Sequence, residues 1–541
     1  MNTKNILITA PVALYTAVAS AASKPDNPDD KNKPNIIIIL ADDLGYGDVH
    51  CYNPERGKIP TPHIDRLAAQ GMRFTDCHSS SGVSSPSRYT LLTGRYHWRT
   101  RLQTGIVNVW ERPLIASNRM TIATLAKQHG YRTAAIGKWH LGWNWQITQE
   151  QKKWMGTGMR DGVATEEHRQ IWQEIFSQPI LDGPTTRGFD DYFGTDVPNW
   201  PPYCFIENDR TVGIPSELLP SDKLIVEKRL ASVQGPALAG WEFEPILPAL
   251  VERVERFIAE SAVKSEPFLL YMPLTSPHTP LSPNEEWQGK SDLKHHVADL
   301  IMETDAVVGR IIEAVEKTGQ AENTFFLFTS DNGFAPYVGV KELETQGHFP
   351  SGPLRGYKGD VYEGGHRIPL IIRWTKVIQP NTVSHQLVHH ADLMATLADM
   401  LGATLPDHAG EDSFSILPIL KGEDQPIREH AVSCSQNGIP GIRVGYWKLI
   451  IGRESPSGAQ TGTSQLRQGV KTQLYHLADD LGEMNDLFEK HPDRAGQMFA
   501  LYEKLISDGR SNRGPVQKND EDCTPYLQLP GVDLSLRKTG K

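Results

Sequence analysis

A short run near position 90 combines a nucleophile-type hydroxyl with the signals of a helix start. Ser84 comes two residues before Pro86, and proline is favoured in the first turn of a helix. Arg88 follows Ser84 by four residues, so its side chain can project toward the same helix end. Gly94 then supplies a helix stop. Because the free N–H groups at a helix start favour negative charge, the run predicts an anion-binding site at the N-terminus of this helix. The alternative is that Ser84 is a plain N-cap of the helix.

Oxygen-bearing side chains follow two apolar runs of the chain. Asp42 and Asp43 end the first run, and Asp331 and Asn332 end a later one. Adjacent carboxylates repel unless a cation lies between them, and a set of oxygens without nitrogen or sulfur suits calcium or magnesium better than zinc. Taken alone, the first pair could cap a helix or lie in a solvated loop, and Asp-Asn-Gly is a common turn. The two pairs together predict a metal site.

A third run ends in Lys138 and His140. In extended backbone, residues two apart face the same side, so both side chains are expected to reach one site. Lysine would bring a point charge for an anion, and histidine an acid or base group. A surface lysine beside a packed histidine is the alternative.

Two further loops carry one candidate each. His278 lies between Pro277 and Pro280, which stiffen the loop around it, although a histidine that caps a strand would look the same. Lys358 lies in a glycine-rich loop that allows the backbone to approach a ligand closely, although such loops are usually just flexible surface.

Strand-like and helix-like segments alternate along the chain. Predicted buried strands are 35–41, 133–137, 268–274, 324–330 and 369–374, and predicted helices are 63–71, 87–93, 121–130, 249–262 and 296–318. This alternation predicts an α/β fold with a large, mixed, mostly parallel sheet between two helical layers. Because ligands bind beyond the carboxyl ends of such strands, the candidate residues are expected to meet there.

The pattern changes near residue 425. Short strand-like pieces at 444–451 and 473–477 and a helix at 494–505 predict a smaller α+β subdomain with an antiparallel sheet. We therefore predict a catalytic α/β domain at 34–424, with a helical insertion at 144–188, and a C-terminal subdomain at 425–541.

The first residues read as an export signal. Lys4 precedes an apolar stretch, and Ala19-Ser20-Ala21 fits a cleavage site, which predicts a signal peptide at 1–22 and a flexible leader at 23–33. A short buried helix is the alternative, but Pro11 argues against it. We expect an exported, soluble protein without a membrane anchor.

The composition is that of a globular protein, with 39% hydrophobic and 22% charged residues and a net charge of −10. An acidic chain is a poor candidate for non-specific nucleic-acid binding, which needs a basic face. Any anionic substrate must therefore be held by local positive charge.

The run Ser84–Arg95 matches the signature C/S-x-P-S-R-x-x-x-L-T-G-R at every fixed position. With it, the chain resembles the type I, formylglycine-dependent sulfatases of the alkaline phosphatase superfamily over most of residues 33–500. The other matching segments are 35–48, 137–142, 187–190, 276–278, 330–333, 355–367 and 474–487.

The resemblance implies one Ca²⁺ ion held by Asp42, Asp43, Asp331 and Asn332. It also implies that Ser84 is the precursor of formylglycine. Serine in place of the cysteine of many relatives resembles the forms that a radical-type, serine-type sulfatase-maturing enzyme processes in anaerobic bacteria.

The remaining roles also come from the resemblance. Arg88 would stabilise the formylglycine, and Lys138 and Lys358 would bind the sulfate. His140 would be the base that acts on the hydrated aldehyde, and His278 the acid that serves the leaving alcohol. Export machinery and the maturing enzyme are then expected partners, in the periplasm of a Gram-negative bacterium.

Sulfated carbohydrate is the expected substrate. The loop around Trp110 and the segment 365–367 favour relatives that remove 6-O-sulfate from galactose or N-acetylgalactosamine, as exo-acting enzymes in glycosaminoglycan or mucin degradation. Asp190, Asp191 and Arg355 are further candidate substrate-binding residues, with Trp110 in the pocket wall.

Two other functions stay open at this point. A phosphatase or phosphonate monoester hydrolase of the same superfamily is the first, and a two-zinc phosphatase would need a second set of metal ligands that the sequence does not display. A glycan-binding pseudoenzyme is the second, if Ser84 is never oxidised.

Overall fold

A computed structural model describes residues 33–156, 162–224, 232–453 and 471–538. The predicted signal peptide and all but the last residue of the predicted leader lie outside the described residues. Among the described helices, none combines the length and the apolar character needed to cross a bilayer.

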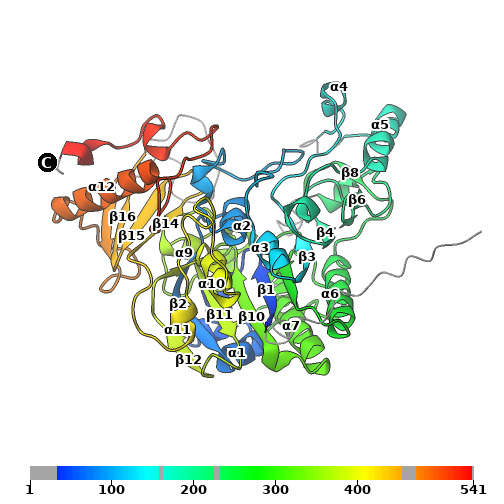
Figure 1. Ribbon diagram of the computed structural model, residues 1–541. Coiled ribbons are helices and arrows are strands. Elements are labelled where there is room, and N and C mark those ends of the chain that lie inside the picture. The colour runs from blue at the N-terminus through cyan, green and yellow to red at the C-terminus, as the bar shows by residue number, and fades with distance from the viewer. Residues whose placement is uncertain (1–32, 157–161, 225–231, 454–470, 539–541) are drawn as a thin grey trace, which may run out of the picture.

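The core of the molecule is a mixed sheet in the order β12-β2-β11-β10-β1-β9-β3-β4-β5-β6, with β13 also paired to β2 (Figure 1). At its centre β1 (Asn35–Ala41) runs parallel to β10 (Thr324–Ser330) on one side and to β9 (Phe268–Pro273) on the other. β3 (Arg132–Lys138) continues the parallel part beyond β9, followed by β4 (Asp191–Thr195). The predicted mostly parallel sheet is confirmed, and four of the five predicted strands lie in its parallel part.

The fifth predicted strand runs the other way. β11 (Arg367–Arg373) is antiparallel to β10 and to β2 (Met72–His78), a strand that the sequence analysis missed. An apolar run shows that a strand is buried on both faces but not its direction; the predicted strand at 369–374 is present and belongs to the antiparallel part of the mixed sheet. The remaining strands of the sheet are β12 (Thr382–Ser384), β13 (Val388–His389), β5 (Ile206–Glu207) and β6 (Arg210–Thr211).

Helices cover both faces of this sheet. The side chains of β1 alternate: Ile37 and Ile39 pack in one core with helices of one layer, and Ile36, Ile38 and Leu40 pack in a second core with the other layer. The first layer holds α1 (Pro62–Ala69), α6 (Ile246–Ala262) and α7 (His296–Lys317); the second holds α2 (Ser84–Thr93), α3 (Ile122–Gln128) and α10 (Asp392–Met400). Burial on both sides explains the uninterrupted run of isoleucines.

A second, antiparallel sheet forms beyond residue 429. Its strands are β14 (His430–Cys434), β15 (Pro440–Val444), β16 (Trp447–Ile450) and β17 (Gln473–His476). α12 (Pro492–Asp508) packs on it, with Phe499 and Tyr502 in a core shared with Val432, Ile442 and Leu449. In Figure 1 this unit lies beside the large sheet, and a bridge between Ser81 and Cys434 joins the two.

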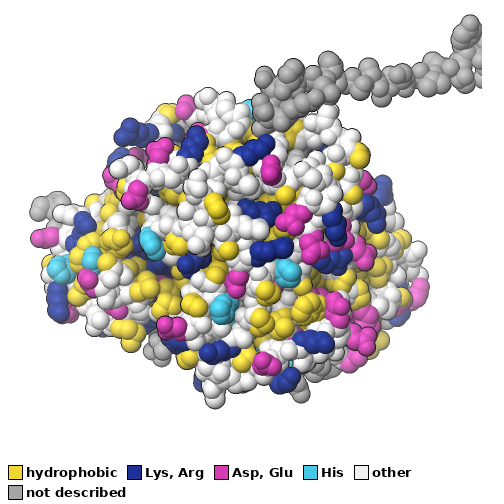
Figure 2. All heavy atoms as spheres, turned by 90° about the horizontal axis from the view of Figure 1, so that it is seen from below, with side chains coloured by type: hydrophobic (Ala, Val, Ile, Leu, Met, Phe, Trp, Pro, Cys, Tyr) yellow, Lys and Arg dark blue, Asp and Glu magenta, His cyan; other side chains and the backbone are white. Residues whose placement is uncertain are grey.

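The predicted helical insertion contains α4 (Gln149–Lys152) and α5 (Glu166–Ser177), each begun by a threonine cap. The other short elements are β7 (Glu217–Leu218), β8 (Pro236–Ala237), α8 (Val340–Thr345), α9 (Glu363–His366) and α11 (Leu417–Leu420). On the face shown in Figure 2, acidic and basic side chains are interspersed and form no continuous basic band.

Candidate active site

Two acidic loops leave the sheet side by side. β1 and β10 are parallel neighbours whose last residues are in register, so the chain emerges from both at the same place. The Asp331 N–H donates to the Ala41 carbonyl at 3.0 Å, and the Asp43 N–H donates to Asp331 Oδ1 at 3.1 Å. Asp42, Asp43, Asp331 and Asn332 are at most 2% exposed. The four predicted oxygen-bearing residues therefore form one buried cluster.

Each of the three buried carboxylates faces its own cation. The closest pairs are Lys138 Nζ–Asp42 Oδ2 at 2.7 Å, Lys358 Nζ–Asp43 Oδ2 at 2.7 Å and Arg88 Nη2–Asp331 Oδ2 at 2.9 Å. Burial alone would raise the pKa of the Asp42 and Asp43 carboxyls, but the neighbouring cations outweigh it and hold both pKa values below their usual range. Three basic and three acidic side chains are thus paired one to one in the site.

The acidic cluster fits a hard divalent cation. The Oδ1 atom of Asn332 is buried and has no hydrogen-bond partner among the described residues, while its Nδ2 donates to Asp43 Oδ1 at 2.8 Å. Asp42, Asp43 and His278 also present potential ligand atoms within 4.8 Å of one another. Three carboxylates and an amide oxygen left without a donor are the set that calcium or magnesium prefers.

Ser84 lies against this cluster. α2 begins at Ser84 itself, two residues earlier than Pro86 suggested, and Ser84 is 2% exposed. Its Oγ donates to Asp42 Oδ1 at 3.4 Å. Arg88, one turn on, donates from Nη1 to the Lys138 carbonyl at 3.2 Å and places Nη2 3.4 Å from Asp42 Oδ1. The predicted neighbourhood of hydroxyl and guanidinium at a helix start is therefore present.

His140 reaches the site by a turn and not by extended backbone. Its φ of +54° lies in the left-handed region, so the expectation that it faces the same way as Lys138 along a strand was wrong about the conformation. The His140 N–H donates to Asp196 Oδ1 at 3.1 Å, and its Nε2 lies 3.2 Å from the Val107 carbonyl. Since a carbonyl only accepts, Nε2 carries the proton. Nδ1 is buried with no partner among the described residues.

The electrostatic surroundings keep His140 neutral. Burial is the largest effect, and the charges of Lys138, Arg88, His278 and Lys358 act in the same direction, so the pKa of the imidazole lies well below its usual 6.5. A neutral ring whose Nε2 is protonated leaves the Nδ1 lone pair free to accept a proton.

His278 approaches from the loop after β9. Its Nδ1 lies 2.6 Å from the Thr279 carbonyl, so Nδ1 carries a proton and Nε2 points toward Asp43 Oδ2 at 3.6 Å. Burial, with the charge of Lys358, lowers the pKa of this ring although Asp42 and Asp43 oppose the shift. The structure thus brings together Ser84, Arg88, Lys138, His140, His278, Lys358, Asp42, Asp43, Asp331 and Asn332.

Two residues around His140 were not anticipated from the sequence. Asp196 follows β4 directly, so the strand-end rule that identified the other candidates would have found it too. Val107 contributes only its backbone, which no pattern of side chains could reveal.

The structure does not bring Asp190 and Asp191 to this site. Asp190 accepts a hydrogen bond from the Thr133 N–H at 3.0 Å, and Asp191 pairs with Arg132 at 3.0 Å. Both contacts are at the start of β3, whereas Lys138 ends it, about 16–20 Å along the strand. The two predicted substrate-binding aspartates therefore lie at the opposite end of β3 from Lys138.

Trp110 and Arg355 have structural partners. The Trp110 ring packs against Trp145 and Phe176 of the insertion, with centroids 5.7 and 6.0 Å apart. Arg355 donates to the Glu483 carbonyl at 2.6 Å and lies 3.8 Å over the Tyr362 ring, so it ties the loop of Lys358 to the C-terminal subdomain. Both support the loops that carry the site.

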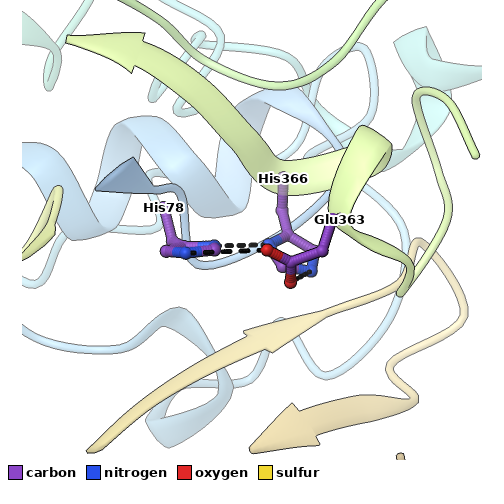
Figure 3. Close-up of side chains that lie close together, drawn as sticks. All are labelled: His78, Glu363 and His366. Atoms are coloured by element: carbon purple, nitrogen blue, oxygen red, sulfur yellow. Dashed lines mark hydrogen bonds and ion pairs between the residues drawn. The ribbon is translucent and has the colours of Figure 1, made fainter. Parts of the chain in front are cut away.

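A second group of possible metal ligands contains His78, Glu363 and His366 (Figure 3). Their donor atoms are already engaged: His78 Nδ1–His366 Nδ1 at 3.0 Å, His78 Nε2–Asp76 Oδ1 at 2.8 Å, His366 Nε2–Val361 O at 3.0 Å and Lys448 Nζ–Glu363 Oε1 at 3.0 Å. With a lysine beside the carboxylate, this group does not fit a second metal ion, as a two-zinc phosphatase would require.

Known proteins resemble this chain in sequence and in fold. The Sulfatase family model matches residues 34–403. An N-acetylgalactosamine-6-O-sulfatase of Bacteroides thetaiotaomicron is 32% identical over 91% of this chain and 97% of its own length, and human arylsulfatase A is 29% identical over 88% of this chain and 87% of its own. A solved B. thetaiotaomicron structure, described under the metabolism of multiple glycosaminoglycans and labelled 6S-sulf, superposes with a TM-score of 0.74 at 31% identity, covering 88% of this chain and 99% of that one.

The fold, the site and these matches define a sulfuric ester hydrolase with an alkaline phosphatase-like sheet. The chain belongs to the sulfatase family, and its activity is the hydrolysis of sulfate esters.

Proposed function

We propose that this enzyme removes 6-O-sulfate groups from terminal galactose or N-acetylgalactosamine residues of sulfated glycans. Support comes from the relative named an N-acetylgalactosamine-6-O-sulfatase, which the chain covers almost completely, and from the solved chain labelled 6S-sulf. The expectation from the 365–367 segment and the Trp110 loop points to the same substrates.

The observation that carries the chemistry is the position of Ser84 at a helix start, 3.4 Å from Asp42, a carboxylate that also contacts Arg88 and Lys138. We propose that a serine-type sulfatase-maturing enzyme oxidises Ser84 to formylglycine. Hydrated, this residue would supply a hydroxyl nucleophile that is regenerated after each turnover, and a Ca²⁺ ion held by Asp42, Asp43, Asp331 and Asn332 would neutralise sulfate oxygens.

Charge balance supports the metal. Without an ion, three cationic and three anionic side chains cancel, so the site has no excess positive charge for an anion. A divalent ion shared among the carboxylates would raise the net charge to about +2. Lys138, Lys358 and Arg88 could then turn toward the sulfate oxygens, whose charge is stabilised in the transition state.

Two histidines divide the proton transfers. His140 is the base: its free Nδ1 takes a proton from the hydrated residue at position 84. His278 is the acid: it enters the reaction protonated at Nε2 and gives that proton to the leaving sugar oxygen, which avoids the release of an alkoxide. The Thr279 carbonyl holds its other nitrogen in place.

The first 22 residues support export, and we propose that the mature enzyme works in the periplasm of a Gram-negative bacterium. The enzyme would then interact with the maturing enzyme and the export machinery before it meets its glycan substrate.

Mass analysis of the peptide that contains Ser84, isolated from the native host, tests the chemistry. We expect a loss of two hydrogens relative to serine. Enzyme produced without a maturing enzyme serves as the control and should retain the serine mass and lack turnover. A fully active preparation that keeps unmodified serine would rule out the proposed nucleophile.

A panel of defined sulfated mono- and disaccharides tests the substrate. Matured enzyme should release sulfate from 6-O-sulfated galactose or N-acetylgalactosamine at a non-reducing end faster than from the 4-O-sulfated isomers. Equal rates on both isomers, or preference for 2-O- or N-sulfate, would contradict the proposed specificity while leaving the sulfatase activity intact.

A further inference from the structure

Val107 joins the signature helix to the catalytic histidine through its own backbone. Its N–H donates to the hydroxyl oxygen of Ser85 at 3.1 Å, and its carbonyl lies 3.2 Å from Nε2 of His140. Ser85 and Val107 are 0% and 2% exposed. A single residue of the 101–112 loop therefore contacts both the neighbour of Ser84 and the base.

Two other contacts hold the 101–112 loop, and neither involves the His140 ring. The Gly105 N–H donates to the Gln436 carbonyl at 2.7 Å, which ties the loop to the turn between β14 and β15. Trp110 packs against the insertion. Between these two anchors, the hydroxyl of Ser85 accepts the hydrogen bond from the Val107 N–H. This bond fixes the backbone of Val107 and thereby the position of its carbonyl.

We propose that Ser85 is a positioning residue for catalysis. Its hydroxyl holds Val107 so that the Val107 carbonyl keeps the proton on Nε2 of His140 and orients the ring, which leaves Nδ1 as the base. This inference rests on the proposed role of His140. It assigns a purpose to the second residue of the signature, a position at which the pattern itself permits any side chain.

The physical reason is the cost of an unpaired amide. Without the hydroxyl, the buried Val107 N–H loses its acceptor, and the loop must shift to find another partner or water. The carbonyl shifts with it, because N–H and C=O flank the same residue. His140 then loses the bond that fixes its tautomer and ring orientation, while Asp196 still holds its backbone.

The test compares Ser85→Ala with Thr90→Val. Both changes remove one fully buried hydroxyl from α2 at positions that the signature leaves open, but Thr90 Oγ1 bonds to Ser80 Oγ at 2.8 Å and has no bond to Val107. Ser85→Cys keeps the volume with a poor acceptor, and Ser85→Thr restores the hydroxyl. Rates are divided by the fraction of chains with an aldehyde at position 84, so altered maturation does not enter the result.

We expect kcat for a 6-O-sulfated sugar to fall about 10- to 100-fold in Ser85→Ala and Ser85→Cys, as for a catalytic group displaced by about 1 Å. KM should change less than about 2-fold, Ser85→Thr should recover most of the rate, and Thr90→Val should match the wild type. Unchanged kcat in both hydroxyl-free variants would overturn the proposal.

A second measurement does not need turnover. In ¹⁵N-histidine spectra of the unmodified protein, His140, assigned with His140→Gln, should show the Nε2–H tautomer, and Ser85→Ala should shift its ring signals while Thr90→Val leaves them in place. Unshifted signals in Ser85→Ala would overturn the proposal even if rates fell. A matured wild type that cleaves no sulfate ester would instead overturn the proposed function, whatever the spectra show.

Discussion

Three cationic and three acidic side chains face one another in the active site, and all are buried except Lys358, whose side chain is 14% exposed. Removing one of these side chains would leave its partner as an unpaired buried charge. A substitution at Lys138 or Asp42 would therefore lower stability as well as activity, and the two effects could not be separated. The two histidines are better probes at the residue scale. Neither belongs to the three close ion pairs, so each can be replaced while those pairs remain.

His140→Gln should lower kcat by about 100-fold or more, because it removes the general base. The pKa of His140 lies well below 6.5, so the neutral, active form persists as the pH falls through 6.5. We therefore expect the acid limb of kcat/KM that His140 controls to have its inflection below pH 6.5, measured as a pH–rate profile. An inflection at or above 6.5 that disappears in His140→Gln would contradict this electrostatic description.

His278→Ala should affect substrates according to their leaving groups. A sugar alkoxide needs protonation as it departs, whereas an activated phenolate does not. We expect a loss of about 100-fold or more for a sugar sulfate and a much smaller loss for 4-nitrophenyl sulfate, from parallel kcat measurements. Equal losses on both substrates would show that His278 is not the acid.

At the scale of elements, a buried charge network joins the two sheets. Glu363 of α9 lies 3.0 Å from Lys448 of β16 and 3.5 Å from Arg443 of β15. Lys448 also lies 2.8 Å from Glu483, whose pKa burial raises to about 7. α9 follows the loop of Lys358, so this network fixes the C-terminal subdomain to the segment that carries this lysine.

Lys448→Met should lower the free energy of unfolding by about 3 kcal/mol, because Glu363 and Glu483 would remain buried without their shared cation. Urea denaturation measures the change. Lys504→Met is the matched control: it breaks the exposed pair with Asp508 on α12 and should cost less than about 1 kcal/mol. Equal effects would show that the network does not hold the two sheets together.

At the scale of the whole molecule, strands far apart in the chain bring the four proposed metal ligands into one cluster. Dialysis against a chelator should lower kcat/KM strongly, since the excess positive charge of the site disappears with the ion. Calcium should restore the activity, and a rise in Tm on adding calcium should accompany it, because the ion binds only the folded ligand set. Restoration by zinc alone would point to phosphatase-type chemistry instead.

Much of the fold could be predicted because local patterns and the global structure agree. The isoleucine run of β1, the helix before β3 and the helix after β9 could be predicted from the apolar pattern, and so could the change to an antiparallel sheet after residue 425. The direction of β11 and the existence of β2 could not be predicted from such patterns. Both depend on which neighbour a strand pairs with, and that neighbour is distant in the chain.

The candidate site divides in the same way. Asp42, Lys138 and Asp331 were found because parallel strands deliver their carboxyl ends to one edge of the sheet. The position of Asp190 at the start of β3 could not be predicted, because a motif match does not say at which end of a strand a residue lies.

By itself, the sequence determined which side chains can do the chemistry, since hydroxyl, imidazole and carboxylate are properties of residue types and the strand-end rule gathers them. Only the tertiary structure decided how they are arranged: each of three carboxylates faces a cation, His140 has a left-handed conformation, and the backbone carbonyl of Val107 contacts Nε2 of His140. Those features depend on distances between segments that no local pattern encodes. Every residue has a backbone carbonyl, so the residue type does not show which carbonyl contacts His140.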